Sequence, residues 1–478
     1  MREIHLHDTR SGALQPLAPS DPGRVGIYAC GPTVYSRIHI GNARPFVIFS
    51  LLKRFLEHEG YGVRLVVNIT DVNDKIYTAA ANAGLPSERL AREMTDAYLA
   101  DTDALGLGRP DAEPRASDAT VMSAILDHIG DLIRAGHAYE SGGDVFFKVR
   151  SDPDYGSLSH RHLHDMDQGE GVEGADRKHD PLDFALWKAR KQDEDTAWDS
   201  PWGPGRPGWH IECSAMAEGL LGVGFDIHGG GSDLLFPHHE NEAAQTRCAR
   251  GQELAKIWMH NGMIQSTGEK MAKSVGNIAP LHETVERYGA PAVVMYLIGG
   301  HYRQPLAFSE AALEQARANV NRIREAGRRL ASGPSAPELE ALRERFFAAL
   351  ARDFNTAEAL AVVNEWIREA TSGLAEGAGG AGGGSGAGDA GAGDAGAGDA
   401  GAGDAHLREM LGVLGLEGLL APTVQAPAGV RELAQRRERA RAERDFAAAD
   451  RLRDEIAALG WEVRDGPAGP DLLPAAGS

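Results

Sequence analysis

Apolar residues form short continuous runs that alternate with helical stretches in the first part of the chain. The run RVGIYAC, residues 24–30, and the run VRLVVNIT, residues 63–70, each predict a buried strand. Between them, NARPFVIFSLLKRFLEHEGY has an apolar residue at nearly every third or fourth position, which is the period of a helix. A helix between two continuously apolar strands predicts a parallel α/β unit.

The pattern returns after a long interruption. Residues from about 110 to 205 look like an insertion of mixed helices followed by loops. FDIHGGG, residues 225–231, predicts a further strand with a glycine turn, and IWMHNGMI, residues 257–264, predicts another. From about residue 281 onward the pattern is helical, and the tail after residue 430 predicts two helices and a short strand.

A glycine-rich segment interrupts the helical part. GAGDA occurs four times in succession over residues 386–405. Glycine and aspartate at this density bury too little apolar area to offset the entropy of ordering. We interpret residues 373–405 as a disordered linker; the alternative is a functional repeat.

Composition and charge narrow the class of protein. A length of 478 residues suggests about three domains. The polar N-terminus has no signal-peptide core, and no apolar run is long enough to span a bilayer. Three cysteines argue for a reducing compartment. The net charge of −20 gives no general attraction for nucleic acid, so any such binding needs a local basic surface.

The segment GSDLLFPHHENEAAQ contains a candidate metal site. If a helix begins near Pro237, His238 and Glu242 share one face, because they are four residues apart. Cys30, at a strand end, and Cys213 can supply two thiolates, which completes an acceptable tetrahedral zinc set. The alternatives are a small core cysteine and a histidine-rich helix start, and Cys248 is expected to be an apolar filler.

Two further segments can bind phosphate. HIGN, residues 39–42, lies where the first strand leads into the first helix, and a helix N-terminus attracts phosphate. GEKMAKSVGN, residues 268–277, is a cationic loop suited to charge that develops in nucleotidyl chemistry. The alternatives are an ordinary turn and a solvated loop. No GxxxxGK[ST] motif is present.

Together these motifs resemble one enzyme family. The HIGN and KMAKS segments are similar to the signatures of class I aminoacyl-tRNA synthetases. With YACGPTVYSRIHIGNAR, VVNITDVNDKI, GRPGWHIECSAM and DIHGGGSDLLFPHHENE, the chain resembles the cysteinyl-tRNA synthetases. The resemblance implies one zinc ion on Cys30, Cys213, His238 and Glu242. It implies ATP binding by His39, Gly41, Asn42, Asp233, Lys270 and Lys273, with His39, Asn42 and the two lysines catalytic. It also implies an amino-acid pocket lined by Gly31, Thr70 and Trp209.

The resemblance implies a reaction and a setting. Zinc would bind the cysteine thiolate and reject serine, since a purely apolar pocket separates such close analogues by only about 1–3 kcal/mol. ATP, with Mg²⁺, would activate L-cysteine as an adenylate, and tRNA(Cys) would accept the cysteinyl group. A cytoplasmic monomer without membrane contact is implied.

The expected architecture is α/β: a Rossmann-like parallel-sheet catalytic domain with an insertion, a helical bundle domain and a small C-terminal anticodon-reading domain. The expected regions are residues 1–110, the first half of the catalytic domain; 111–205, the connective insertion; 206–280, the second half with the KMAKS loop; 281–335, a helical stem-contact region; 336–425, a helical tRNA-binding bundle with the linker 373–405; and 426–478, the anticodon-binding domain.

The chain departs from the family pattern in places. Asn42 stands where the family usually has histidine, and Ala272 replaces a serine of the KMSKS loop. The tail ends PDLLPAAGS, without the family's usual tryptophan. Residues 431–444 hold six arginines against three glutamates, which indicates a local basic face or an ordinary solvated helix.

Two other functions compete with this interpretation. A mycothiol-pathway ligase, which joins cysteine to an amino sugar, shares the catalytic core but has no use for an anticodon-reading tail. A non-catalytic paralogue that binds nucleotide or tRNA is expected to lose the lysines or the zinc ligands, and all are present here.

Overall fold

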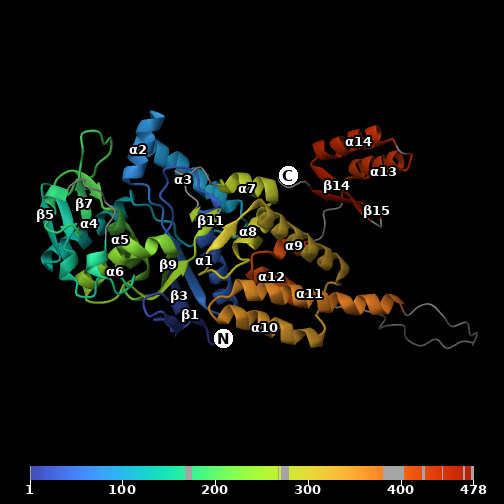
Figure 1. Ribbon diagram of the computed structural model, residues 1–478, viewed down its shortest axis with the longest axis horizontal. Coiled ribbons are helices and arrows are strands. Elements are labelled where there is room, and N and C mark those ends of the chain that lie inside the picture. The colour runs from blue at the N-terminus through green and yellow to red at the C-terminus, as the bar shows by residue number, and fades with distance from the viewer. Residues whose placement is uncertain are drawn as a thin grey trace, which may run out of the picture. The chain divides into compact units, whose positions relative to one another are not determined.

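The computed structural model describes two compact units, Met1–Glu417 and Gly418–Ser478. The first unit carries the sheet and the long helices, and the second is a small α+β unit (Figure 1). The described residues are 2–166, 175–266, 269–270, 279–379, 403–421, 426–443, 445–466 and 469–474.

A four-stranded parallel sheet lies at the centre of the first unit. Its order is β10 (Ala255–Asn261), β9 (Phe225–Gly231), β3 (Arg24–Ala29) and β4 (Gly62–Val67). All neighbouring pairs are parallel, and the predicted α/β class is confirmed. The four carboxyl ends therefore meet at one edge, where ligands of such sheets bind.

Helices cover the two faces of this sheet. On one face, α1 (Ile40–His58) approaches so closely that a Cβ at Gly229 would lie 2.1 Å from the Phe49 ring. On the other face, Tyr28 and Cys30 pack with Cys213 and Met216 of α5 (Trp209–Leu221). Because side chains alternate along a strand, Tyr28, Cys30 and His228, which is paired in register with Tyr28, share the α5 face.

The inserted segment contains a second sheet that the sequence analysis missed. Expected to be mixed helices and loops, residues 110–205 hold α4 (Ala119–Arg134) ahead of an antiparallel sheet, whereas α2 (Asp74–Ala83) and α3 (Ser87–Asp103) precede this segment. The sheet consists of β5 (Ala138–Ser141), β6 (Asp144–Phe147), β7 (Phe184–Ala189) and β8 (Gly205–Pro207). These strands are three to six residues long, too short to establish a period.

The later part of the first unit is helical, as expected. Its helices are α6 (Glu240–Arg250), α7 (Leu281–Tyr288), α8 (Ala290–Leu297), α9 (Glu310–Arg329), α10 (Glu340–Ala351), α11 (Thr356–Gly379) and α12 (Ala405–Val413). Two small sheets accompany them: β1 (His5–Asp8) with β2 (Ala13–Pro16), and β11 (Ile264–Ser266) between β12 (Glu269–Lys270) and β13 (Leu306–Phe308).

The predicted linker is shorter than expected on both sides. Helix α11 continues to Gly379, so residues 373–379 are helical. At the far side, the Asp404 backbone N–H donates to the Ala331 carbonyl at 3.0 Å, and the Ser335 hydroxyl donates to the Gly403 carbonyl at 2.7 Å. The GAGDA repeats between residues 386 and 402 lie outside the described residues.

The second unit has the predicted two helices and strand, plus one more strand. Helices α13 (Ala428–Ala442) and α14 (Phe446–Ala458) pack with the antiparallel pair β14 (Trp461–Gly466) and β15 (Gly469–Pro474). Its small core contains Val430, Ala434, Ile456, Trp461 and Val463.

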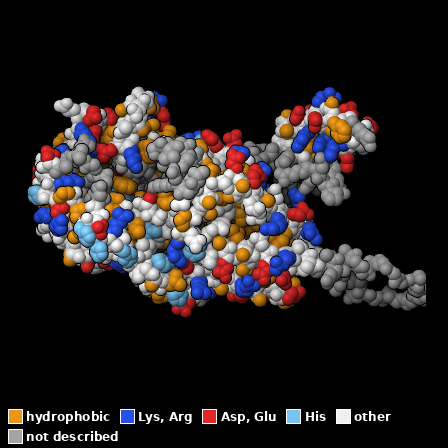
Figure 2. Space-filling view, viewed as in Figure 1, with side chains coloured by type: hydrophobic (Ala, Val, Ile, Leu, Met, Phe, Trp, Pro, Cys, Tyr) orange, Lys and Arg blue, Asp and Glu red, His pale blue; other side chains and the backbone are white. Residues whose placement is uncertain are grey.

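Charges of both signs are spread over the face of the first unit drawn in Figure 2. Blue and red side chains are interspersed there, consistent with an acidic chain that has no general attraction for polyanions. Among the described residues, no helix is both long and apolar enough to cross a membrane.

Gly208 lets α5 begin directly beside β7. Its N–H donates to the Leu186 carbonyl at 2.9 Å, and an added Cβ would lie 2.0 Å from the Ala185 carbonyl oxygen. We expect Gly208→Ala to cost about 1–3 kcal/mol, because backbone must shift, and to lower the thermal unfolding midpoint. Gly219→Ala is the matched control on the same helix, since nothing lies within 4 Å of its added Cβ. Equal midpoints for the two variants would contradict this account.

Candidate metal centre and adenylate pocket

Four buried side chains converge at the carboxyl edge of the sheet. Cys30 follows β3, Cys213 lies on α5, and His238 and Glu242 come from the turn Leu235–His239 and from α6. One ligand atom from each lies within 4.8 Å of all the others. Cys30 is 8% exposed and the other three are at most 1% exposed.

The helix that carries His238 and Glu242 begins later than predicted. Helix α6 starts at Glu240, and the preceding turn is interrupted at Phe236, whose φ of −140° and ψ of 132° are not helical. His238 nevertheless lies one turn before Glu242, and its Nε2 is 3.0 Å from Glu242 Oε1. The expected i, i+4 pairing therefore forms across a helix start.

The distances from the Cys30 sulfur to the other three ligand atoms match a tetrahedral zinc site. Zn–S bonds of about 2.3 Å at tetrahedral angles place two sulfurs about 3.8 Å apart, and a sulfur about 3.5 Å from a nitrogen or oxygen ligand. Cys30 Sγ lies 3.8 Å from Cys213 Sγ and 3.6 Å from both His238 Nε2 and Glu242 Oε1. The residues fit the metal that the resemblance implies.

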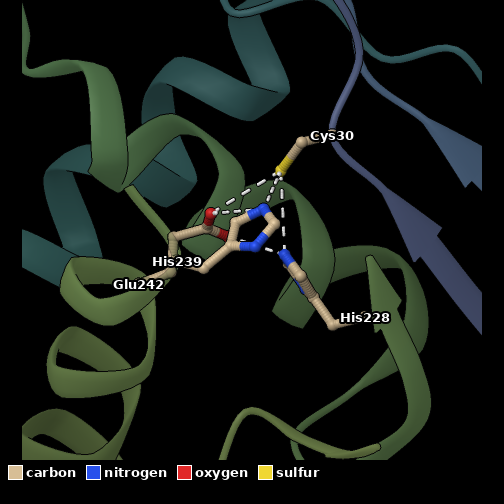
Figure 3. A group of neighbouring side chains, drawn as sticks. All are labelled: Cys30, His228, His239 and Glu242. Carbon is tan, nitrogen blue, oxygen red and sulfur yellow. Dashed lines mark hydrogen bonds and ion pairs between the residues drawn. The ribbon is translucent and has the colours of Figure 1, made fainter. Parts of the chain in front are cut away.

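A second group shares two of these residues. Figure 3 shows Cys30 and Glu242 facing His228, from β9, and His239. Cys30 Sγ is 3.7 Å from His228 Nε2 and 3.3 Å from His239 Nε2. This alternative set has one thiolate, whereas the first set has two.

The outer nitrogens of His238 and His228 favour the first set. A metal-binding histidine almost always donates its other N–H to a partner. His238 Nδ1 lies 2.9 Å from His210 Nδ1, so the partner is present. His228 Nδ1 is buried and has no hydrogen-bond partner among the described residues.

Burial disfavours the charged forms of these four side chains. It raises the pKa of Cys30 well above the usual value, and it raises that of Glu242 to about 7. The hydrogen bond with Cys30 lowers the pKa of Cys213, but burial and the nearby carboxylates of Glu242 and Glu212 together outweigh it, and the pKa is raised. Burial lowers the pKa of His238 to about 3. A divalent cation would compensate the anionic forms of these acids, which are otherwise costly to bury.

The three predicted pocket residues lie beside this cluster. The Gly31 N–H donates to Asn68 Oδ1 at 2.9 Å, and a Cβ at Gly31 would lie 1.8 Å from the Asn68 carbonyl oxygen, so only glycine fits. The Asn68 amide donates to the Thr70 hydroxyl at 3.2 Å. The Trp209 ring stacks on His238 with centroids 4.3 Å apart.

The predicted phosphate site is closed by its own helix cap. His39 Nδ1 accepts from the Gly41 N–H at 3.0 Å, and Asn42 Oδ1 accepts from the His39 N–H at 3.2 Å. The Ile40 N–H donates to the Ala279 carbonyl at 3.0 Å. The free N–H groups expected at this helix start therefore have partners here, and a phosphate would have to replace them.

The structure describes less of the other residues that are predicted to bind ATP. Asp233 lies in the single turn Ser232–Leu234 that directly follows β9. Lys270 lies in β12, and its backbone pairs with that of Gln265 in β11. The side chain of Lys270 and all of Lys273 lie outside the described residues.

Sequence reasoning missed four buried histidines around the cluster. His210, His228, His239 and His260 are each at most 7% exposed. Two of them had a usable signal, since His228 and His260 lie within predicted strands of the parallel sheet whose carboxyl edge binds ligands. His239 adjoins a predicted ligand, but its direction depends on the irregular turn before α6.

Comparison with known proteins defines the class first. Residues 16–318 match the family model described as tRNA synthetases class I (C) catalytic domain. Residues 345–418 match a DALR domain, and residues 423–469 match a cysteinyl-tRNA ligase anticodon binding domain. The chain is thus an enzyme of the class I aminoacyl-tRNA synthetases.

Full-length relatives identify the family. The chain is 43% identical to the cysteine--tRNA ligase of Symbiobacterium thermophilum and 44% identical to that of Halorhodospira halophila, with 98% of each chain covered. The chain belongs to the cysteine--tRNA ligase family, which confirms the family expected from the sequence.

Solved structures agree with the fold. Mycobacterium tuberculosis methionyl-tRNA synthetase in complex with methionyl-adenylate aligns with a TM-score of 0.59 at 20% identity, covering 74% of this chain and 84% of that one. The LeuRS–tRNA–LeuAMS complex of Agrobacterium radiobacter K84 aligns with a TM-score of 0.58 at 12% identity, covering 85% of each chain.

Proposed function

We propose that this chain activates L-cysteine with ATP and transfers it to tRNA(Cys), and that one zinc ion on Cys30, Cys213, His238 and Glu242 selects the substrate thiolate. The observation that carries the zinc site is the spacing of four buried ligand atoms, which matches two thiolates, an imidazole and a carboxylate around one tetrahedral ion. The names of the full-length relatives support the reaction.

The ligand set suits the discrimination that the reaction requires. Cysteine and serine differ in one atom, and shape alone separates such analogues by only about 1–3 kcal/mol. Zinc, when bound, supplies a soft acceptor that favours a thiolate over a hydroxyl. Gly31, Thr70 and Trp209 would then hold the rest of the amino acid beside the ion.

Glu242 is the ligand that we propose to give way to the substrate sulfur. It is the one oxygen ligand among softer sulfur and nitrogen ligands. Its Oε2 has no hydrogen-bond partner among the described residues, although it lies 3.2 Å from His228 Nε2. His228 Nε2 is therefore placed to hold this carboxylate if Glu242 is not a ligand.

The remaining residues would position ATP and tRNA. Asp233 would hold the adenosine ribose, and His39, Gly41, Asn42, Lys270 and Lys273 would contact the phosphates, which Mg²⁺ accompanies. Catalysis then consists of positioning the cysteine carboxylate against the α-phosphate and stabilising the developing charge. The arginine-rich helix α13 would contact the anticodon end of tRNA, where local positive charge is needed on an acidic chain.

The domain assignment belongs to the same proposal. Residues 1–110 and 206–280 would form the catalytic domain around the insertion 111–205. Residues 281–335 and 336–425 would contact the tRNA, and 426–478 would read the anticodon. A cytoplasmic monomer is the proposed state.

The function is tested by ATP-dependent charging of total tRNA with labelled cysteine, with serine and an amino sugar as controls. We expect cysteine to be charged onto tRNA, serine to be rejected, and no transfer to the sugar. If cysteine were transferred to the sugar alone, the chain would be a cysteine–sugar ligase and the proposed synthetase function would be wrong.

The metal site is tested by a matched pair of cysteine variants. We expect Cys213→Ser to lose bound zinc and most cysteine-dependent pyrophosphate exchange, because it replaces one of four ligands. Cys248→Ser should keep both, since Cys248 packs at the edge of the hydrophobic cluster around α4 and outside the ligand set. If Cys213→Ser kept its full zinc content, Cys213 would not be a zinc ligand.

Zinc affinity should rise steeply with pH. Both thiols and Glu242 have raised pKa values in the metal-free form, so binding must release their protons. We expect the logarithm of affinity to rise with a slope of about three per pH unit below the Glu242 pKa and about two above it, up to the thiol pKa values. His238, with a pKa of about 3, contributes nothing near neutrality.

Competition with a chelator of known proton affinity, at several pH values, measures this slope. The weak residual zinc affinity of Cys213→Ser should rise with a slope lower by about one, because one thiol proton no longer leaves. A slope of one or less in the unaltered chain would show that the thiols are not ligands.

A further inference from the structure

We propose that Thr9, in the N-terminal hairpin, is a positioning residue that fixes His239 against the Cys30 sulfur through His260. Thr9 Oγ1 lies 2.7 Å from His260 Nδ1, and His260 Nε2 lies 2.8 Å from His239 Nδ1. His239 Nε2 then lies 3.3 Å from Cys30 Sγ. This chain of three contacts rests on the proposed zinc site and adds a residue that the ligand set does not include.

The hairpin holds Thr9 firmly in place. Thr9 directly follows β1, and its N–H donates to the Trp258 carbonyl at 2.9 Å on strand β10. Its own carbonyl accepts from His160 Nε2 at 2.9 Å. The backbone N–H, the carbonyl and the hydroxyl are therefore all engaged, so the hydroxyl has a fixed direction toward His260.

The hydroxyl sets the direction of the whole chain of hydrogen bonds. The shared proton is assigned to the hydroxyl, which then donates to His260 Nδ1, because Thr9 Oγ1 has no other acceptor for its hydrogen among the described residues. A neutral imidazole that accepts at one nitrogen donates from the other. His260 Nε2–H then donates to His239 Nδ1, and His239 Nε2–H points to Cys30 Sγ.

This direction decides between the two overlapping ligand groups. A nitrogen that carries a proton cannot bind a metal, so His239 donates to the Cys30 thiolate and does not join the set with His228. The reverse direction would present the His239 lone pair to the site. Thr9 thereby favours the two-thiolate set of Cys30, Cys213, His238 and Glu242 over the one-thiolate set drawn in Figure 3.

The test compares Thr9→Val, which keeps the shape and removes the hydroxyl, with Thr9→Ser, which keeps the hydroxyl. Ser11→Ala is the control in the same hairpin, because Ser11 is exposed and its hydroxyl contacts the Asp8 carbonyl and the Gln15 amide, with no hydrogen bond to a histidine among the described residues. Zinc affinity is measured by chelator competition on the full chain. The sulfur-to-metal absorption of the cobalt(II) form reports the number of thiolates, and thermal unfolding is recorded for each variant.

We expect Thr9→Val to lose about ten- to a hundredfold in zinc affinity, as outer partners of metal ligands usually do, and to change the cobalt(II) spectrum. Thr9→Ser and Ser11→Ala should match the unaltered chain. If Thr9→Val does not fold, Thr9→Ala provides the same comparison with a smaller side chain.

Two results would overturn the proposal. If Thr9→Val had unchanged zinc affinity and an unchanged spectrum, with only a lower unfolding midpoint, Thr9 would merely stabilise the hairpin. The proposed zinc ligands would be unaffected by that result. A one-thiolate spectrum in the unaltered chain would instead contradict the proposed two-thiolate ligand set. The role proposed for Thr9 would then fail as well.

Discussion

The burial of two thiols, an imidazole and a carboxylate around one point is the constraint on which the rest of this structure depends. Cys30, Cys213, His238 and Glu242 are nearly inaccessible to water, yet the metal-binding forms of the two thiols and of Glu242 are anions that are costly to bury alone. The arrangement becomes reasonable when a cation completes it. The sheet edge, the start of α5 and the turn before α6 must then meet to within a few tenths of an ångström.

Backbone geometry provides that precision. Gly208 allows α5 to begin against β7, and Gly31 allows the chain after Cys30 to lie against the Asn68 carbonyl. The antiparallel sheet of the insertion therefore does more than extend the molecule, because its strand β7 sets where Cys213 can be. The insertion and the metal centre are therefore structurally linked, because β7 lies against the start of the helix that carries Cys213.

Much of this arrangement could be predicted because the signals are local. Cys30 follows a continuously apolar strand, and the four-residue spacing of His238 and Glu242 persists although α6 begins later than expected. The remainder depends on contacts between distant segments. The strands β5–β8 are too short to show a period, and the His260 and Thr9 side chains meet across 251 residues. No local pattern specifies that His239 faces Cys30 while His238 pairs with His210.

Asn42 illustrates how a departure from a family pattern acquires a physical meaning. In this structure its side chain accepts from the His39 N–H while His39 Nδ1 accepts from Gly41, so the pair caps α1 reciprocally. Such caps stabilise a helix by about 1 kcal/mol. The same amides are the groups that a nucleotide phosphate would use. Asparagine at position 42 therefore gives the helix a stable start in the absence of nucleotide, and phosphate binding becomes an exchange of one set of acceptors for another at a single helix end.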